Sequence, residues 1–147
     1  MAWVRIEIAD LKDAKVAALI EACQTAALGA GQDDPTPAII ADVIARIRAE
    51  IAGCRANVLH PDTATIPSDL RSLACRMVVR QCQSRLQIAL NEDEREEQRN
   101  DLRYLERIAA CDIPVAAPDD GQIQAGTIAP AIAPRARFFT KADQDGA

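Results

Sequence analysis

Apolar and polar residues recur with a helical period through most of residues 1–111. The clearest stripe repeats every three or four residues between Ile39 and Ile51, with charged side chains largely on the other side. Thr36 suits the N-cap of this helix, Pro37 suits its first helical position, and Gly53 weakens its end. The pattern therefore predicts an amphipathic helix from Thr36 to about Gly53.

A shorter helix is expected before it. The segment Ala2–Ile8 alternates apolar and charged residues, which is typical of an extended chain. Asp10 can then cap a helix that runs to about Leu28, because apolar residues follow it at spacings of three and four. Gly29, Gly31 and the segment Asp33–Pro35 predict a loop after it.

Two more helices follow. The third is predicted to begin at Ser68, to be central, and to extend for roughly 35 Å. Its apolar residues are Leu70, Leu73, Ala74, Met77, Val78, Cys82 and Leu86. The fourth opens with Asn91 and Glu94, the pattern of a capping box. Its first turns are wholly polar, so we expect them to face solvent or a partner.

The helical pattern stops at Asp112. The residues that interrupt it are Pro114, Pro118, Gly121, Gly126, Pro130 and Pro134. They exclude a regular helix and are typical of an extended arm. The sequence therefore predicts an all-α fold, a small bundle of about four helices over residues 1–111, with an extended C-terminal arm over residues 112–147.

Composition narrows the class of protein. Of 147 residues, 49% are apolar and only 3% aromatic, so the core must be aliphatic. The net charge of -5 disfavours free binding to a nucleic-acid backbone. The N-terminus is charged and shows no signal peptide, and no apolar run approaches the ~20 residues of a membrane span.

The cysteines predict no metal site. There are five, an odd number, without a C-x-x-C pair, and His60 is the single histidine. Most fall inside or at the ends of helical patterns, where cysteine usually acts as a small apolar residue. We therefore expect a reducing compartment.

No catalytic constellation is found. Phosphate-binding loops, dinucleotide-binding turns and nucleophile elbows are missing from the sequence. His60 lies in a Pro-containing loop and is best explained as a surface residue. The acidic cluster at Glu92–Glu97 favours the helix dipole at an N-terminus. We expect no enzyme activity, no cofactor and no metal.

Two features indicate contact with other proteins. Arg95, Arg99, Arg103 and Arg107 are four residues apart, which places them on one ridge of the fourth helix. The ridge is either a solvated, salt-bridged face or a strip that pairs with carboxylates of a neighbouring subunit. Trp3 is a further candidate for a subunit interface.

The second feature is the end of the arm. Phe138 and Phe139 are flanked by basic residues, which makes a basic and aromatic tip on an acidic protein. The candidate partner-binding residues are Arg135, Arg137, Phe138, Phe139, Thr140 and Lys141. The alternative is a partly disordered terminus. We favour docking, because two adjacent solvated Phe side chains promote aggregation.

Several segments together resemble one family. Arg99–Cys111 resembles the last helix of the Mu-type phage head–tail joining proteins, the connector adaptors that complete the head, and Pro67–Cys75 resembles the start of their central helix. The tip Arg137–Lys141 followed by Gly146, and the opening Ile8–Leu11, are similar as well. The resemblance spans most of the chain in the right order, although Ala147 follows Gly146 where the family often has an aromatic residue.

The resemblance implies a structural role in a virion. Such subunits form a ring, expected here to be a dodecamer, below the portal protein of a tailed phage. They join the DNA-filled head to a tail-side stopper or tail-completion protein. Genomic DNA would pass through the channel without specific binding, and no membrane is involved. Assembly would take place in the host cytoplasm, and the protein would end at the head–tail junction of the virion.

Two other classes stay open. A helical nucleic-acid-binding protein, such as a small DNA-packaging subunit or regulator, would need a basic recognition helix. The candidate is the third helix, with Arg71, Arg76, Arg80 and Arg85. The other class is a host-encoded helical enzyme subunit, which would carry a bound cofactor.

Overall fold

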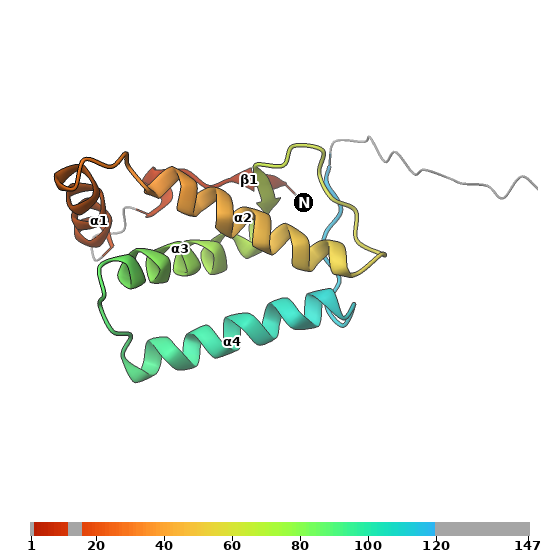
Figure 1. Cartoon of the computed structure of the whole chain (residues 1–147). Coiled ribbons are helices and arrows are strands. Elements are labelled where there is room, and N and C mark those ends of the chain that lie inside the picture. The colour runs from red at the N-terminus through yellow and green to blue at the C-terminus, as the bar shows by residue number, and fades with distance from the viewer. Residues whose placement is uncertain (1, 12–15, 120–147) are drawn as a thin grey trace, which may run out of the picture.

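The structure is a computed structural model, and it describes residues 2–11 and 16–119 (Figure 1). In chain order its elements are β1 (Trp3–Arg5), η1 (Ile8–Leu11), α1 (Ala17–Gly29), α2 (Thr36–Gly53), β2 (Thr65–Pro67), η2 (Ser68–Leu70), α3 (Arg71–Arg85) and α4 (Glu92–Ala109). The predicted all-α bundle of about four helices is confirmed. Most of the predicted arm lies outside the described residues.

Helix α2 organises the bundle. It packs against both α3 and α4, and α1 lies at one end of the bundle against α3 (Figure 1). The predicted stripe of α2 faces the core: Ile39, Ile40, Val43, Ile44, Ile47 and Ile51 are all buried. This stripe supplies apolar contacts on two sides at once, which explains why it is the strongest periodic signal in the sequence.

The first helix begins later than predicted. Asp10 does not cap it, because its carboxylate accepts the main-chain N–H of Glu7 at 2.9 Å and pairs with Arg71 of α3. The chain there forms η1, and α1 begins at Ala17. At α2 Thr36 is the first helical residue and not the N-cap, which is Pro35. The Oδ1 of Asp34 accepts the N–H of Thr36 at 2.9 Å, and the Thr36 side chain is buried.

The start of α4 agrees with the prediction. The Asn91 side chain accepts the N–H of Glu94 at 2.7 Å, and the Glu94 carboxylate accepts the N–H of Asn91 at 2.9 Å. These two bonds form a complete capping box. Helix α3 is shorter than predicted: its 15 residues span about 22 Å.

Three of the helices end in the same way. After α1, α3 and α4 the chain turns through a left-handed residue, with φ of 72° at Gly31, 55° at Gln87 and 67° at Cys111. At each end two backbone hydrogen bonds close the Schellman motif; after α4 they are Cys111 N–H to Ile108 O and Asp112 N–H to Arg107 O. Glycine is preferred at this position, so a cysteine there is unusual.

The extended N-terminal segment has a partner that the sequence did not reveal. β1 pairs antiparallel with β2, with Val4 opposite Ile66. Ile66 is fully buried and leads directly into η2 and α3. The two strands therefore fix the entry of the central helix.

A buried ion-pair cluster joins α3 to α4. These two helices are more widely separated than either is from α2, and side chains bridge them. Asp101 of α4 pairs with Arg80 and, at 2.6 Å, with Arg76 of α3. The Arg80 and Asp101 side chains are only 9% and 7% exposed. Their charges are therefore paired away from water, where loss of one partner is strongly destabilising.

The ion pair makes stability depend on Asp101. Burial by itself raises the pKa of this carboxyl, but hydrogen bonds and charges from Arg76 and Arg80 lower it overall. Asp101→Asn should reduce the free energy of unfolding by about 3 kcal/mol, because the buried Arg80 then keeps only the half-exposed Glu97, at 3.5 Å, as a counter-charge. Glu97→Gln is the control: Glu97 also contacts both arginines but is half exposed, so the loss should stay below about 1 kcal/mol. Urea unfolding measures both.

The pH dependence follows from the lowered pKa. The stabilisation is fully present above the ordinary carboxyl pKa of about 4 and is lost as the pH falls through the lower pKa of the folded state. The stability curves of the wild type and Asp101→Asn should therefore converge in acid. Curves that stay parallel down to the acid limit would show that the charge of Asp101 does not stabilise the fold.

Candidate functional site at the C-terminal end of the bundle

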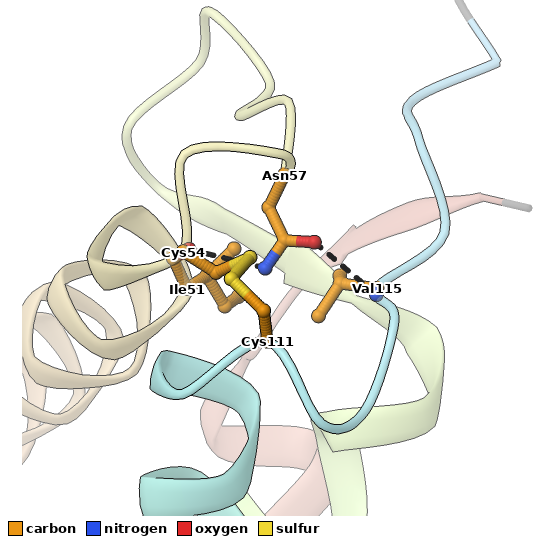
Figure 2. The surroundings of a disulfide bond; sticks show 5 residues. All are labelled: Ile51, Cys54, Asn57, Cys111 and Val115. Atoms are coloured by element: carbon orange, nitrogen blue, oxygen red, sulfur yellow. Dashed lines mark hydrogen bonds between the residues drawn. A yellow bond between two sulfur atoms is a disulfide. The ribbon is translucent and has the colours of Figure 1, made fainter.

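A disulfide bond closes the end of the bundle. Cys54 follows α2 and Cys111 follows α4, with Cα atoms 5.2 Å apart, and their sulfurs are bonded (Figure 2). The helices also approach closely beside the bond, because a Cβ on Gly53 would lie 3.2 Å from the Cβ of Ala109. The expectation that cysteine acts as a small apolar residue is therefore wrong for this pair. It agrees with the buried, unbonded Cys23 and Cys82.

The chain beyond the bond is held against the body. We call residues 111–116 the root of the C-terminal segment. Asn57 lies between α2 and the root: its amide donates to the carbonyl of Ile51 at 3.2 Å, and its Oδ1 accepts the N–H of Val115 at 3.4 Å (Figure 2). The indole of Trp3 donates to the carbonyl of Ala116 at 3.2 Å. Residues 111–116, the first of the C-terminal segment, are therefore part of the bundle.

Trp3 itself is fixed by its surroundings. It stacks on His60 with ring centroids 6.0 Å apart, and the Arg48 guanidinium lies 5.5 Å from the centre of the indole ring. Arg48 also donates to the carbonyls of His60 at 2.7 Å and Thr65 at 2.8 Å. The loop before β2 is thus tied to α2, and Trp3 serves contacts within the chain. Burial lowers the pKa of Arg48.

The predicted arginine ridge on α4 is exposed and divides into two halves. Arg95 and Arg99 share the carboxylate of Glu92, at 3.7 Å and 3.2 Å. Arg103 and Arg107 are exposed and form no ion pair with any residue in the described ranges. The unneutralised half of the ridge therefore lies toward the end of α4 that carries the disulfide.

Two hollows flank the ion-pair cluster between α3 and α4. One, of about 480 Å³, is lined in part by Leu11, Cys75 and Val79, and the other, of about 390 Å³, by Met77, Ile88 and Leu102. Burial raises the pKa of the Cys75 thiol, which disfavours the nucleophilic thiolate at neutral pH. Within the described ranges, no group of three His, Cys, Asp or Glu side chains could hold a metal ion.

The structure places the predicted residues unevenly. The tip residues Arg135, Arg137, Phe138, Phe139, Thr140 and Lys141 lie outside the described residues. The root was not predicted at all, although one signal was present: a cysteine follows the last helix where glycine is preferred, and a second cysteine follows the end of α2. Asn57 gave no signal, because its partners are brought to it only by the fold.

Comparisons with family models, with curated proteins and with solved structures found no match to this chain. No helix in the described part of the chain is long and apolar enough to cross a bilayer. The geometry therefore defines a class only: a helical bundle with a fixed exit for its C-terminal segment.

The left-handed Cys111 gives a test of the root by two substitutions. Both Cys111→Ser and Cys111→Gly remove a cross-link that spans 57 residues of sequence and should lower the free energy of unfolding, by about 2–4 kcal/mol for serine. Glycine adopts the positive φ without a Cβ penalty, so Cys111→Gly should be about 1 kcal/mol more stable than Cys111→Ser.

Denaturant unfolding of both variants and of the wild type, with and without reductant, checks this order. In reductant Cys111→Gly should exceed the wild type. Equal stability of the serine and glycine variants would show that φ at residue 111 relaxes once the bond is gone.

Proposed function

We propose that this chain is a structural head–tail connector (adaptor) of a tailed phage, which forms a ring below the portal protein and joins the filled head to the tail. The proposal rests on the resemblance of the Arg99–Cys111 and Pro67–Cys75 segments to the Mu-type head–tail joining proteins. One structural observation supports it most: the bundle has its own closed core, and its C-terminal segment leaves from a root fixed by a covalent bond and two side-chain hydrogen bonds.

A fixed root suits an assembly protein. A segment that leaves a subunit in one direction reaches the same place on every neighbour of a symmetric ring. The segment beyond residue 119 carries the aromatic and basic tip, which would dock on the portal protein or on a neighbouring subunit. The unneutralised half of the α4 ridge, Arg103 and Arg107 beside the root, offers guanidinium groups to carboxylates of a partner.

The alternative, a nucleic-acid-binding protein, loses its best candidate element. The arginines of α3 already have partners: Arg71 pairs with Asp10, Arg76 and Arg80 with Asp101, and Arg85 bonds Gln32 at 3.3 Å. A recognition helix needs such side chains free for phosphates and bases. Titration with duplex DNA at low salt separates the two classes, and tight, salt-dependent binding would favour the alternative.

Charge reversal tests the α4 ridge. Arg103→Glu/Arg107→Glu should abolish most joining of heads to tails, because like charges would then face the partner's carboxylates. Arg95→Glu/Arg99→Glu should impair joining less, since Glu92 already neutralises part of that half. The matched control is Arg46→Glu/Arg85→Glu, which makes the same change of charge at exposed positions of α2 and α3.

Joining is scored in a complementation assay with a phage that lacks the protein, and circular dichroism verifies that each variant stays helical. Normal joining by Arg103→Glu/Arg107→Glu would reduce the ridge to a solvated face.

Deletion tests the tip. A chain that ends before Arg135 should keep the stability of the full chain, since every described core residue precedes it, but should no longer join heads. The reason is loss of Phe138 and Phe139, the only large aromatic anchors in the segment. The double substitution Phe138→Ala/Phe139→Ala is the finer variant, with Ala142→Ser as its control. If both shortened and substituted chains complement fully, the tip has no role in joining.

A further inference from the structure

We propose that the Cys54–Cys111 bond is a late lock. Both thiols would stay reduced during folding and assembly, and the bond would close when the particle enters an oxidising medium, which immobilises the root of the C-terminal segment. The claim that the bond closes only after assembly rests on the proposed function, whereas the claim that the root responds to oxidation does not.

The two bonded cysteines differ in their access to solvent. Cys54 is buried, with 3% of its surface exposed, whereas Cys111 is an exposed residue in the turn after α4. A small oxidant can therefore approach Cys111 from solvent, whereas Cys54 lies within the protein. The other cysteine pair differs: Cys23 and Cys82 are both buried in the core, where burial and the neighbouring thiol raise the pKa of Cys82 to about 12. The thiolate needed for exchange is scarce there.

Cys111 has an unfavourable backbone conformation. Its positive φ is costly for a residue with a Cβ, and of the three left-handed positions after helices only the one after α1 holds glycine. With the bond open, only the backbone hydrogen bonds of the Schellman motif, from the N–H groups of Cys111 and Asp112, offset the cost of this conformation. The last turn of α4 should then open more often, and the bond should suppress that opening.

The disulfide bond also affects how firmly the root is held to the bundle. Backbone hydrogen bonds keep residues 111–113 on the last turn of α4 whether or not the bond is closed. The polar contacts that hold the root to the rest of the body are the Asn57–Val115 and Trp3–Ala116 hydrogen bonds, at 3.4 Å and 3.2 Å. Both are long, and Ile113 and Val115 add only partly buried packing. The bond pins residue 111 a few residues before these contacts, so their effective concentration rises. Closing it therefore changes the root from a segment that detaches to one that stays docked.

Thiol–disulfide exchange with a small disulfide can form the bond. The Cys111 thiolate attacks one sulfur of a small disulfide such as oxidised glutathione, which forms a mixed disulfide and releases one glutathione thiolate. The Cys54 thiolate then attacks the Cys111 sulfur and expels the second. Two protein thiols become one disulfide, and one oxidised glutathione becomes two reduced molecules, so electrons and protons balance. In cytoplasm the glutathione pool keeps such thiols reduced, and outside the cell they oxidise.

The test uses the full chain in glutathione buffers. In a buffer whose glutathione redox potential is as reducing as that of cytoplasm, differential alkylation and mass spectrometry should find Cys54 and Cys111 as free thiols. In an oxidising buffer these two cysteines should be bonded to each other, with Cys23, Cys75 and Cys82 still free. Amide hydrogen exchange over residues 112–116 should slow by at least about tenfold on oxidation, with little change in α2.

The controls need no unstable variant, because the wild type in the two buffers is its own comparison. Cys75→Ser should respond as the wild type does, and Cys54→Ser should exchange as fast in oxidising buffer as the reduced wild type. Two results would overturn the proposal: a Cys54–Cys111 bond that persists at the cytoplasmic poise, or exchange at the root that is equal in both states.

The lock and the connector role can fail separately. If the chain joins no heads but its root responds to oxidation, the connector role is wrong and the redox device stands. If the chain joins heads but its root does not respond to oxidation, the connector role stands and the redox lock is wrong. If both are right, Cys54→Ser should assemble normally in cells, and the released particles should lose their tails faster than wild-type particles in oxidising buffer.

Discussion

The position of α4 depends on one buried ion pair, Arg80 with Asp101. Helix α4 has few core residues of its own: besides Asp101, only Leu105 and Ile108 are buried, both in its second half. Apolar packing alone would let the helix rotate or slide against α2 and α3. A buried carboxylate between two guanidinium groups tolerates neither movement, because any shift leaves a charge unpaired. The ion pair therefore fixes the rotation and register of a helix that buries only two apolar side chains of its own.

The far end of α4 is fixed differently. There Gly53 lets α2 approach Ala109 closely, and the chain turns through Cys111 into the bond with Cys54. With the helix fixed at its middle by charge and at its end by packing and a covalent bond, the start of the C-terminal segment has a defined place. The first turns of α4 have no buried side chain and contact α3 through polar groups only, with Glu94 accepting from Gln83 at 3.1 Å and Glu97 pairing with Arg76 and Arg80.

The sequence predicted what depends on local periodicity and missed what depends on contacts between distant segments. The α2 stripe and the α4 capping box follow from neighbours within a few residues, so they could be read directly. Asp101 was overlooked because a carboxylate counts as a surface residue, yet it lies four and seven positions before Leu105 and Ile108, on the apolar face. That placement was a usable signal for a buried ion pair. The pairing of β1 with β2, and of Cys54 with Cys111, joins segments about sixty residues apart. Its traces in the sequence were the alternating residues of Ala2–Ile8, which did not name a partner strand, and the unusual cysteine after α4.

The distribution of charge along α4 adds a last constraint on how a partner could bind. Glu92 serves the helix dipole and also holds Arg95 and Arg99, so the first half of the ridge is largely neutralised from within. Arg107, in the last turn, favours the dipole at the other end, which is reason enough for its presence. Arg103 has no such role and no ion pair among the described residues, and it lies two turns before Cys111 on the way to the root. A partner that bound the exposed arginines and the C-terminal segment together would gain from both contacts at once, because the root holds them at a fixed separation.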